Sequence, residues 1–127
     1  MIEQDTLEKR AKSIYLGIGS NLGDKKRNIE KAKFELIQNN IEILESSSFY
    51  ESISWPNPKN PKFFNIVLKI KSNLDPRGLL KICKEIEKKL GRKKNFKNSP
   101  RECDIDILDF KRKKISNEII LPHPRMH

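Results

Sequence analysis

The sequence predicts an α+β protein, a ferredoxin-like sandwich in which an antiparallel sheet carries both helices on one face. Three observations predict it. Hydrophobic residues switch between strand and helix periodicity in the order β-α-β-β-α-β. The 127 residues suit one domain with a small core. Two cysteines and seven prolines exclude a disulfide scaffold and a low-complexity chain.

The first strand and the first helix follow one another directly. Residues 13–19 alternate between apolar side chains and a tyrosine or glycines, which predicts a strand. Residues 24–39 place Ile29, Ala32 and Leu36 on one helical face, which predicts an amphipathic helix.

The middle of the chain predicts strands on either side of a loop. Residues 41–53 are strand-like, and residues 63–70 alternate clearly. Between them, residues 55–61 contain three prolines, which predicts a loop.

The second helix begins at Asp75, an N-cap residue followed by proline, and ends at Gly91. The segment 88–101 is rich in lysine and arginine and has no acidic residue. Residues 103–110 predict the next strand, and residues 115–121 a short strand of their own.

Polar residues gather on the sheet face that the helices leave open. Side chains alternate along a strand, so Asp104 and Asp106 share the face opposite Ile105. The same alternation adds residues of two other strands to this face: Gly17, Gly19, Phe63 and Asn65.

Two carboxylates at this spacing repel one another unless a cation neutralises them. Carboxylate oxygens suit Mg²⁺, which completes its coordination with water and substrate phosphates. The basic segment adds Arg92, Lys94 and Arg101 as candidate phosphate contacts, a combination typical of phosphoryl transfer. Taken singly, an Asp-x-Asp pair or a basic run is more often plain solvated surface.

The net charge of +10 favours an anionic partner such as a nucleotide, a nucleic acid or a membrane surface. No P-loop is present, and Gly17–Gly23 is one residue too long for a dinucleotide fingerprint. Cys83 and Cys103 lie at apolar positions typical of core thiols, and no zinc spacing occurs. Without a long apolar run or a secretory signal, a cytoplasmic protein with no membrane contact is expected.

Six short blocks follow one another in a specific order: Gly17–Asp24, Ser48–Ser52, Pro61–Asn65, Ile86–Arg92, Pro100–Leu108 and Leu121–His127. Together they resemble the 6-hydroxymethyl-7,8-dihydropterin pyrophosphokinase family, from about Ile14 to the C-terminus. The resemblance implies an enzyme that transfers the diphosphoryl group of ATP to the hydroxymethyl group of the pterin and releases AMP, in folate biosynthesis.

The resemblance also implies roles for single residues. Two Mg²⁺ ions would be held by Asp104 and Asp106, with Arg92 and Arg101 as further catalytic residues. Contacts to ATP are implied for Glu87, Arg92, Lys94, Ile107 and His123. Contacts to the pterin are implied for Ser52, Ile53, Trp55, Phe63 and Asn65.

The chain departs from the family pattern in two places. Asn98 and Ser99 stand where the family often has a loop tryptophan, and the chain stops at His127, before the usual final strand. We therefore expect a polar arm at residues 1–12, and a monomeric pyrophosphokinase domain at residues 13–127 that lacks the usual C-terminal strand and binds no nucleic acid.

Two alternatives stay open at this point. The missing tail would suit a paralogue with impaired catalysis. The charge and the open sheet face would suit a basic RNA-binding module on the same fold, although the RNP1 pattern is absent and two acids on that face would repel phosphate. An assay for AMP separates these alternatives from the enzyme.

Overall fold

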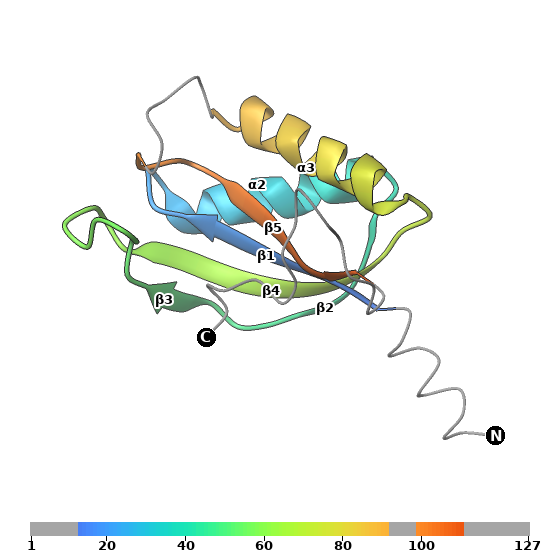
Figure 1. The fold of residues 1–127 in the computed structure, drawn as a ribbon, viewed down its shortest axis with the longest axis horizontal. Helices are drawn as coiled ribbons and strands as arrows, with labels where there is room; N and C mark the ends of the chain where they lie inside the picture. Colours follow the sequence, from blue (N-terminus) through green and yellow to red (C-terminus); the bar gives the residue numbers. More distant parts are fainter. Residues whose placement is uncertain (1–12, 92–98, 111–127) are drawn as a thin grey trace.

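The computed structural model describes residues 13–91 and 99–110, which form a five-stranded antiparallel sheet and two helices (Figure 1). In chain order the elements are β1 (Ile14–Ser20), α2 (Lys25–Gln38), β2 (Glu42–Ser46), β3 (Tyr50–Ser52), β4 (Phe63–Lys71), α3 (Pro76–Lys89) and β5 (Asp104–Phe110). The predicted α+β arrangement is confirmed. The expected arm at 1–12 and the expected strand at 115–121 lie outside the described residues.

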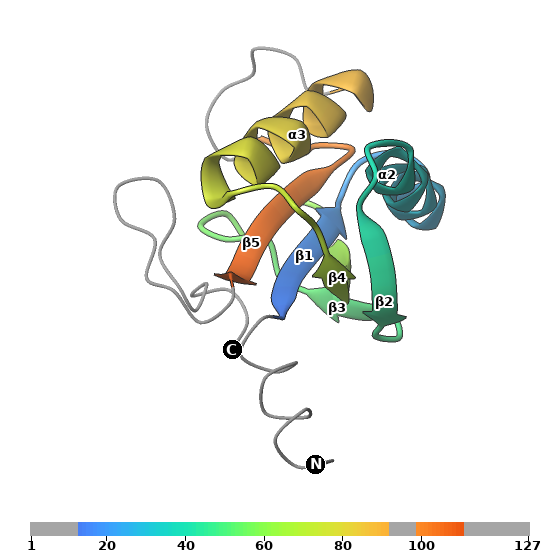
Figure 2. The ribbon, with the colours of Figure 1, turned by 90° about the vertical axis from the view of Figure 1, so that its right-hand side faces the viewer.

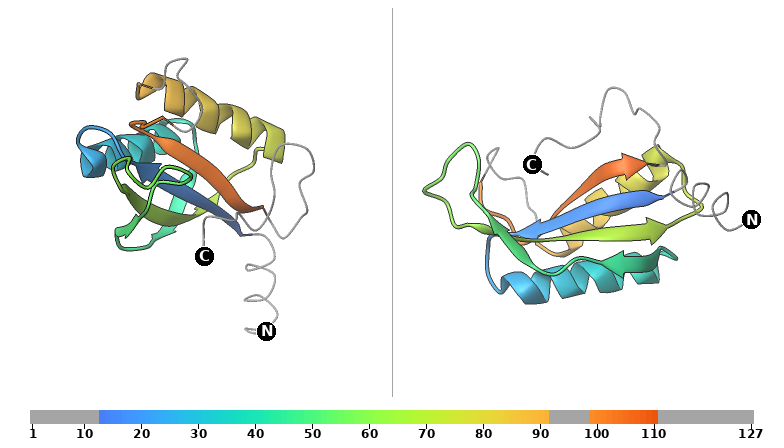
Figure 3. Two further views of the ribbon diagram at one scale, coloured as in Figure 1. Left: turned by 60° about the vertical axis from the view of Figure 1, so that its left-hand side comes forward. Right: turned by 90° about the horizontal axis from the view of Figure 1, so that it is seen from below.

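The strand order is β2-β4-β1-β5, with β3 also paired to β4. Strand β1 is therefore central, and β5 is the edge of the described sheet. Both helices pack on the same face of the sheet (Figures 2 and 3). We call the opposite face, which no described helix covers, the open face. Neither described helix is long and apolar enough to cross a membrane.

The hydrophobic core lies between the sheet and the two helices. Along β1, Ile14, Leu16 and Ile18 are buried at every second position, as the alternation predicts. They belong to one cluster with Leu36 of α2 and Leu79 of α3. Burying one such side chain contributes about 1.5–3 kcal/mol, so this layer fixes which strand faces point to solvent.

Both helices begin and end where the sequence predicts. The carboxylate of Asp24 accepts a hydrogen bond from the backbone N–H of Arg27 at 3.2 Å, and that of Asp75 from Gly78 at 2.7 Å. These bonds satisfy donors that a helix N-terminus leaves unpaired. After α3 the chain turns at Gly91, whose φ of +124° favours glycine.

The strand predicted over 41–53 is two strands in the structure. Between β2 and β3 the chain leaves regular pairing, yet Ser47 still bonds to β4. Its backbone N–H donates to the Val67 carbonyl at 2.9 Å, and its hydroxyl accepts from the Val67 N–H at 2.8 Å. A serine side chain thus replaces one backbone acceptor, which the sequence pattern did not reveal.

Strand β5 contains an irregularity that the sequence pattern also missed. Leu16 of β1 pairs with Ile107, but Tyr15, the residue before it, pairs with Asp109. Leu108 therefore has no pairing partner in β1 and forms a β-bulge. This shift restores Phe110 to the core side, where it is buried. The acids of β5 that precede the bulge, Asp104 and Asp106, keep the face predicted for them and pair with Gly19 and Gly17 of β1.

Candidate active site

A row of residues crosses the open face near the end of β1. Asp104 of β5 lies opposite Gly19 of β1, and Gly19 lies opposite Asn65 of β4. Tyr50 of β3 continues the row on the far side of Asn65. Strands β4, β1 and β5, which carry most of this row, lie side by side when the sheet is seen from below (Figure 3, right). The structure therefore brings together the predicted acid, glycine and amide.

The missing side chain of Gly19 makes room for its neighbours. A Cβ atom there would lie 2.9 Å from Oδ1 of Asn65, closer than real Cβ contacts, and 3.1 Å from Cδ1 of Phe63, which is tighter than most of them. The Asn65 amide nitrogen donates to the Ser52 hydroxyl at 2.9 Å and to the Tyr50 carbonyl at 3.3 Å. These bonds leave the Asn65 carbonyl oxygen over Gly19, where it can accept from a planar ligand.

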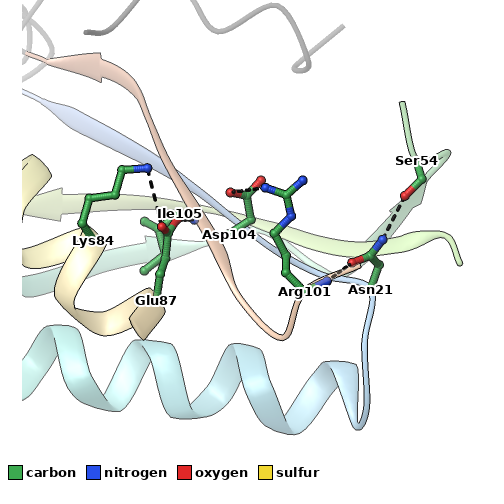
Figure 4. A network of polar contacts seen from close by, with 7 residues as sticks. All are labelled: Asn21, Ser54, Lys84, Glu87, Arg101, Asp104 and Ile105. Atoms are coloured by element: carbon green, nitrogen blue, oxygen red, sulfur yellow. Dashed lines mark hydrogen bonds and ion pairs between the residues drawn. The ribbon is translucent and has the colours of Figure 1, made fainter. Parts of the chain in front are cut away.

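Asp104 is paired with an arginine that is itself buried. Nη1 of Arg101 lies 3.6 Å from Oδ1 of Asp104, and each residue is 9% exposed (Figure 4). The guanidinium also lies over the ring of Phe63, 6.0 Å from its centroid. Within the described residues, the buried Nε of Arg101 has no hydrogen-bond partner. A buried cationic donor of this kind favours an anionic ligand.

The second acid lies one row further along the same strands. Asp106 pairs with Gly17 of β1, and the side chain of Leu108 covers that glycine. In the described part of the chain, no three metal-ligating side chains come together. An ion held by Asp104 and Asp106 would take its other ligands from water or substrate, as Mg²⁺ does in phosphate-binding sites.

Glu87 and Ile107 lie at the outer edge of β5. Glu87 is 1% exposed, accepts from the backbone N–H of Ile105 at 2.7 Å, and has its other oxygen 3.6 Å from Lys84 Nζ (Figure 4). The Ile107 side chain is in the core, so only its backbone, at the same edge by strand alternation, can reach a ligand.

The pterin contacts predicted at the end of β3 and in the loop that follows it, Ser52, Ile53 and Trp55, differ in exposure. Ser52 already bonds to Asn65, as described above. Ile53 is 65% exposed and Trp55 is 72% exposed, so neither packs closely against the described protein. The other predicted residues, Arg92, Lys94 and His123, lie outside the described residues.

Sequence reasoning missed three residues next to this site. Tyr50 shares the strand face of Ser52, two positions away, so alternation could have found it. Burial raises the pKa of its phenol, which favours the neutral donor. Asn21 and Ser54 are buried polar residues, and nothing in the pattern around them signals that.

A comparison with protein families decides what this site belongs to. The family model for 7,8-dihydro-6-hydroxymethylpterin-pyrophosphokinase (HPPK) matches residues 15–127. This chain belongs to the HPPK family. The resemblance inferred from the sequence blocks is therefore confirmed.

Curated relatives of this HPPK-family chain agree. It is 44% identical over 113 residues to the 2-amino-4-hydroxy-6-hydroxymethyldihydropteridine pyrophosphokinase of Aquifex aeolicus, covering 88% of this chain and 70% of the relative. The enzyme of the same name from Bacillus subtilis is 36% identical, covering 89% and 69%. A folate synthesis bifunctional protein of Arabidopsis thaliana is 32% identical, covering 98% of this chain and 25% of the relative. These names indicate a transferase and favour neither alternative function.

Proposed function

We propose that this HPPK-family chain transfers the diphosphoryl group of ATP to the hydroxymethyl group of 6-hydroxymethyl-7,8-dihydropterin and releases AMP. One observation carries the proposal beyond the family name. The predicted phosphate side of the site, Asp104, and its predicted pterin side, Asn65, lie on either side of Gly19 in one row. A glycine between them lets the two substrates meet against the sheet.

On the pterin side, Asn65 would read the edge of the ring. Its Oδ1 faces the space over Gly19, while its amide nitrogen is fixed by Ser52. Phe63 is buried beside it at 7% exposure and supplies an aromatic wall. A polar edge contact beside an apolar wall suits a flat heteroaromatic ligand.

On the phosphate side, Asp104 and Asp106 would hold Mg²⁺. Their oxygen donors and their shared face fit that ion, as argued above. Mg²⁺ bound there would neutralise phosphate charge and make the hydroxymethyl oxygen a better nucleophile. Asp104, next to the pterin side of the row, is also the candidate to accept the hydroxyl proton.

Arg101 would exchange partners when substrates bind. In the structure its guanidinium lies beside Asp104, and its Nε is unsatisfied within the described residues. A triphosphate offers it stronger acceptors, so positive charge becomes available where charge develops in phosphoryl transfer. We propose the same phosphate-binding role for Arg92 and Lys94, and an ATP contact for His123.

The adenine half of ATP would lie along the outer edge of β5. The backbone of Ile107 lies at this edge, and Glu87 holds the adjacent Ile105 N–H. This geometry supports Ile107 as a backbone contact. For Glu87, the geometry supports a structural role, because its carboxylate holds the backbone of β5 in position through the Ile105 N–H.

The proposal also covers assembly and location: a monomer in the cytoplasm that binds no nucleic acid. A mass near 14.9 kDa by light scattering would agree with a monomer. A steep salt-dependent affinity for RNA without AMP formation would instead favour the nucleic-acid module.

AMP formation from ATP, Mg²⁺ and the hydroxymethyl-dihydropterin tests the proposed reaction. We expect AMP and the pterin diphosphate in equal amounts, and none after chelation of Mg²⁺. Asp104→Asn and Asp106→Asn should abolish turnover with the fold intact. Asp109→Asn is the matched control on the same strand beyond the bulge, and it should retain activity. Near-normal turnover in both site variants would overturn the metal assignment.

A further inference from the structure

Asn21, at the end of β1, connects two segments that are far apart in the sequence. Its side chain donates from Nδ2 to the Ser54 hydroxyl at 2.9 Å and to the Pro61 carbonyl at 3.2 Å. Its Oδ1 accepts from the backbone N–H of Arg101 at 2.8 Å, and its own N–H donates to the Arg101 carbonyl at 3.1 Å (Figure 4). Asn21 itself is 2% exposed.

The two contacts of Nδ2 join the beginning and the end of the loop 53–62. Ser54 stands near the start of this loop and Pro61 near its end, and the Ser54 hydroxyl donates to the Pro61 carbonyl at 3.0 Å. Lys25 adds a bond from its Nζ to the Lys62 carbonyl at 2.8 Å, but it lies in an exposed position. Asn21 is therefore the buried attachment of a loop that carries two of the predicted pterin contacts, Ile53 and Trp55.

The oxygen of the same carboxamide holds the segment that carries the phosphate-side arginine. Bonds to both the N–H and the carbonyl of Arg101 fix its backbone where the chain approaches β5. Only a carboxamide supplies two donors and an acceptor from one planar group. Because the group is buried, loss of its Oδ1 leaves the backbone N–H of Arg101 without the acceptor that the carboxamide supplies, and so the arrangement favours asparagine.

We propose that Asn21 is a positioning residue that fixes the 53–62 loop relative to Arg101, so that the pterin side and the phosphate side of the site are set by one side chain. The proposal rests on the proposed function for the identity of the two substrates. The coupling of loop and arginine can be measured without any turnover.

Steady-state kinetics of graded variants test the positioning role. Asn21→Asp keeps the oxygen that accepts from Arg101 and loses both donors, so the KM for the pterin should rise tenfold or more while the KM for ATP stays within twofold. Asn21→Ala loses all side-chain bonds, so both KM values should rise. Ser54→Ala removes the hydroxyl that bonds to Asn21 and to Pro61 but leaves the bonds between Asn21 and Arg101 in place, so it should raise only the KM for the pterin.

Asn28→Asp is the matched control. Its amide nitrogen donates to the Leu22 carbonyl at 2.9 Å and to the Ser20 hydroxyl at 3.3 Å, so both bonds join the first turns of α2 to the end of β1 and the residues just after it. The variant loses amide bonds of the same kind, but these bonds do not connect to the 53–62 loop or to Arg101. Both KM values should therefore stay within twofold of the wild type. An equal rise of the pterin KM in Asn28→Asp would overturn the proposal.

Fluorescence anisotropy of Trp55, the single tryptophan of the chain, supplies a readout without substrates. Asn21→Asp and Ser54→Ala should lower the anisotropy because the loop gains freedom, and Asn28→Asp should not. Unchanged anisotropy in the first two variants would show that Asn21 does not hold the loop.

The double variant Asn21→Asp/Ser54→Ala completes the test. Ser54 keeps its own bond to Pro61 in Asn21→Asp, so the double variant should lose more pterin affinity than Asn21→Asp alone. If the two residues also act through their shared contact, the loss should be smaller than the sum of the two single losses. Additive losses would overturn the shared contact. Wild-type protein without AMP formation would defeat the proposed function, whereas active wild type with unchanged pterin KM in Asn21→Asp would defeat only the role of Asn21.

Discussion

Gly19 lies directly opposite Asn65, and the Asn65 carbonyl oxygen occupies the space that a side chain on Gly19 would need. A Cβ atom at Gly19 would lie 2.9 Å from Oδ1 of Asn65. Glycine is thus required at position 19 because the Asn65 side chain approaches the backbone closely. The backbone angles of Gly19 do not themselves require glycine. Its effect is to let the Asn65 amide, the proposed pterin contact, lie close against the central strand.

Gly19→Ala should weaken pterin binding and spare ATP binding. The added methyl group would push the amide of Asn65 and the ring of Phe63 out of place. Losing one well-oriented hydrogen bond that leaves a buried partner unsatisfied costs about 1–3 kcal/mol, so the KM for the pterin should rise roughly 5- to 150-fold. Steady-state kinetics with each substrate varied in turn would measure this.

Gly17→Ala is the control for that change. It lies on the same face of the same strand, but its Cβ would meet only the side chain of Leu108, at 3.3 Å or more. The side chain can shift, so the pterin KM should stay near that of the wild type. Equal effects of the two alanines would argue against a specific role for the space over Gly19.

Arg101→Ala should lower both stability and turnover, through different partners. The variant removes the guanidinium that lies 3.6 Å from the buried Asp104 carboxylate, which should lower the free energy of unfolding by about 1–3 kcal/mol. It also removes phosphate-side charge, so kcat should fall about 100-fold or more. Urea unfolding and AMP release would measure the two effects.

Adding Asp104→Asn to Arg101→Ala separates the effect on stability from the effect on turnover. The neutral amide no longer needs a cation, so the double variant should regain stability relative to Arg101→Ala. It should stay inactive, because the proposed metal ligand is lost as well. Recovery of activity in the double variant would contradict the role assigned to the pair.

Glu87→Ala should destabilise the edge of the sheet. The N–H of Ile105 would lose the acceptor it has at 2.7 Å, and a buried unpaired donor costs about 1–3 kcal/mol. Glu87→Gln keeps an acceptor and should cost less. Chemical denaturation, with the exposed Glu85→Ala of the same helix as control, measures the difference.

The same variants decide between two roles of Glu87. A higher ATP KM in Glu87→Gln at unchanged stability would indicate a direct contact to the nucleotide. Loss of stability in Glu87→Ala alone, with normal ATP KM in the folded glutamine variant, would indicate a structural role at the edge.

The sequence pattern correctly predicts which face of a strand each side chain occupies. Alternation places Asp104, Asp106 and Asn65 on one face, because a strand that buries every second side chain against the helices points the others to the opposite face. The helix ends at Asp75 and Gly91 were equally predictable, since capping depends on residues close in sequence. In each case the controlling interaction is local.

What depends on contacts between distant segments could not be predicted. The Asn21 amide bonds to residues 33, 40 and 80 positions away. Glu87 reaches across to β5, and the extra Leu108 is revealed only by pairing with β1. A polar residue in a turn motif looks solvated until the partner segments are in place.

Stability should fall in alkaline solution because of Cys83. Burial, and next the charge of Glu87, raise the pKa of the Cys83 thiol from 9.0 to about 12. The folded protein therefore keeps the thiol protonated while the unfolded chain loses the proton above pH 9. The stabilisation is fully present below pH 9 and is lost as the pH rises towards 12, by at most about 1.4 kcal/mol per pH unit.

Urea unfolding of Cys83→Ala should show a shallower decline of stability between pH 9 and pH 12. Cys103→Ala, which removes the other buried thiol, should keep the contribution of Cys83. An identical pH dependence in wild type and Cys83→Ala would rule out this linkage.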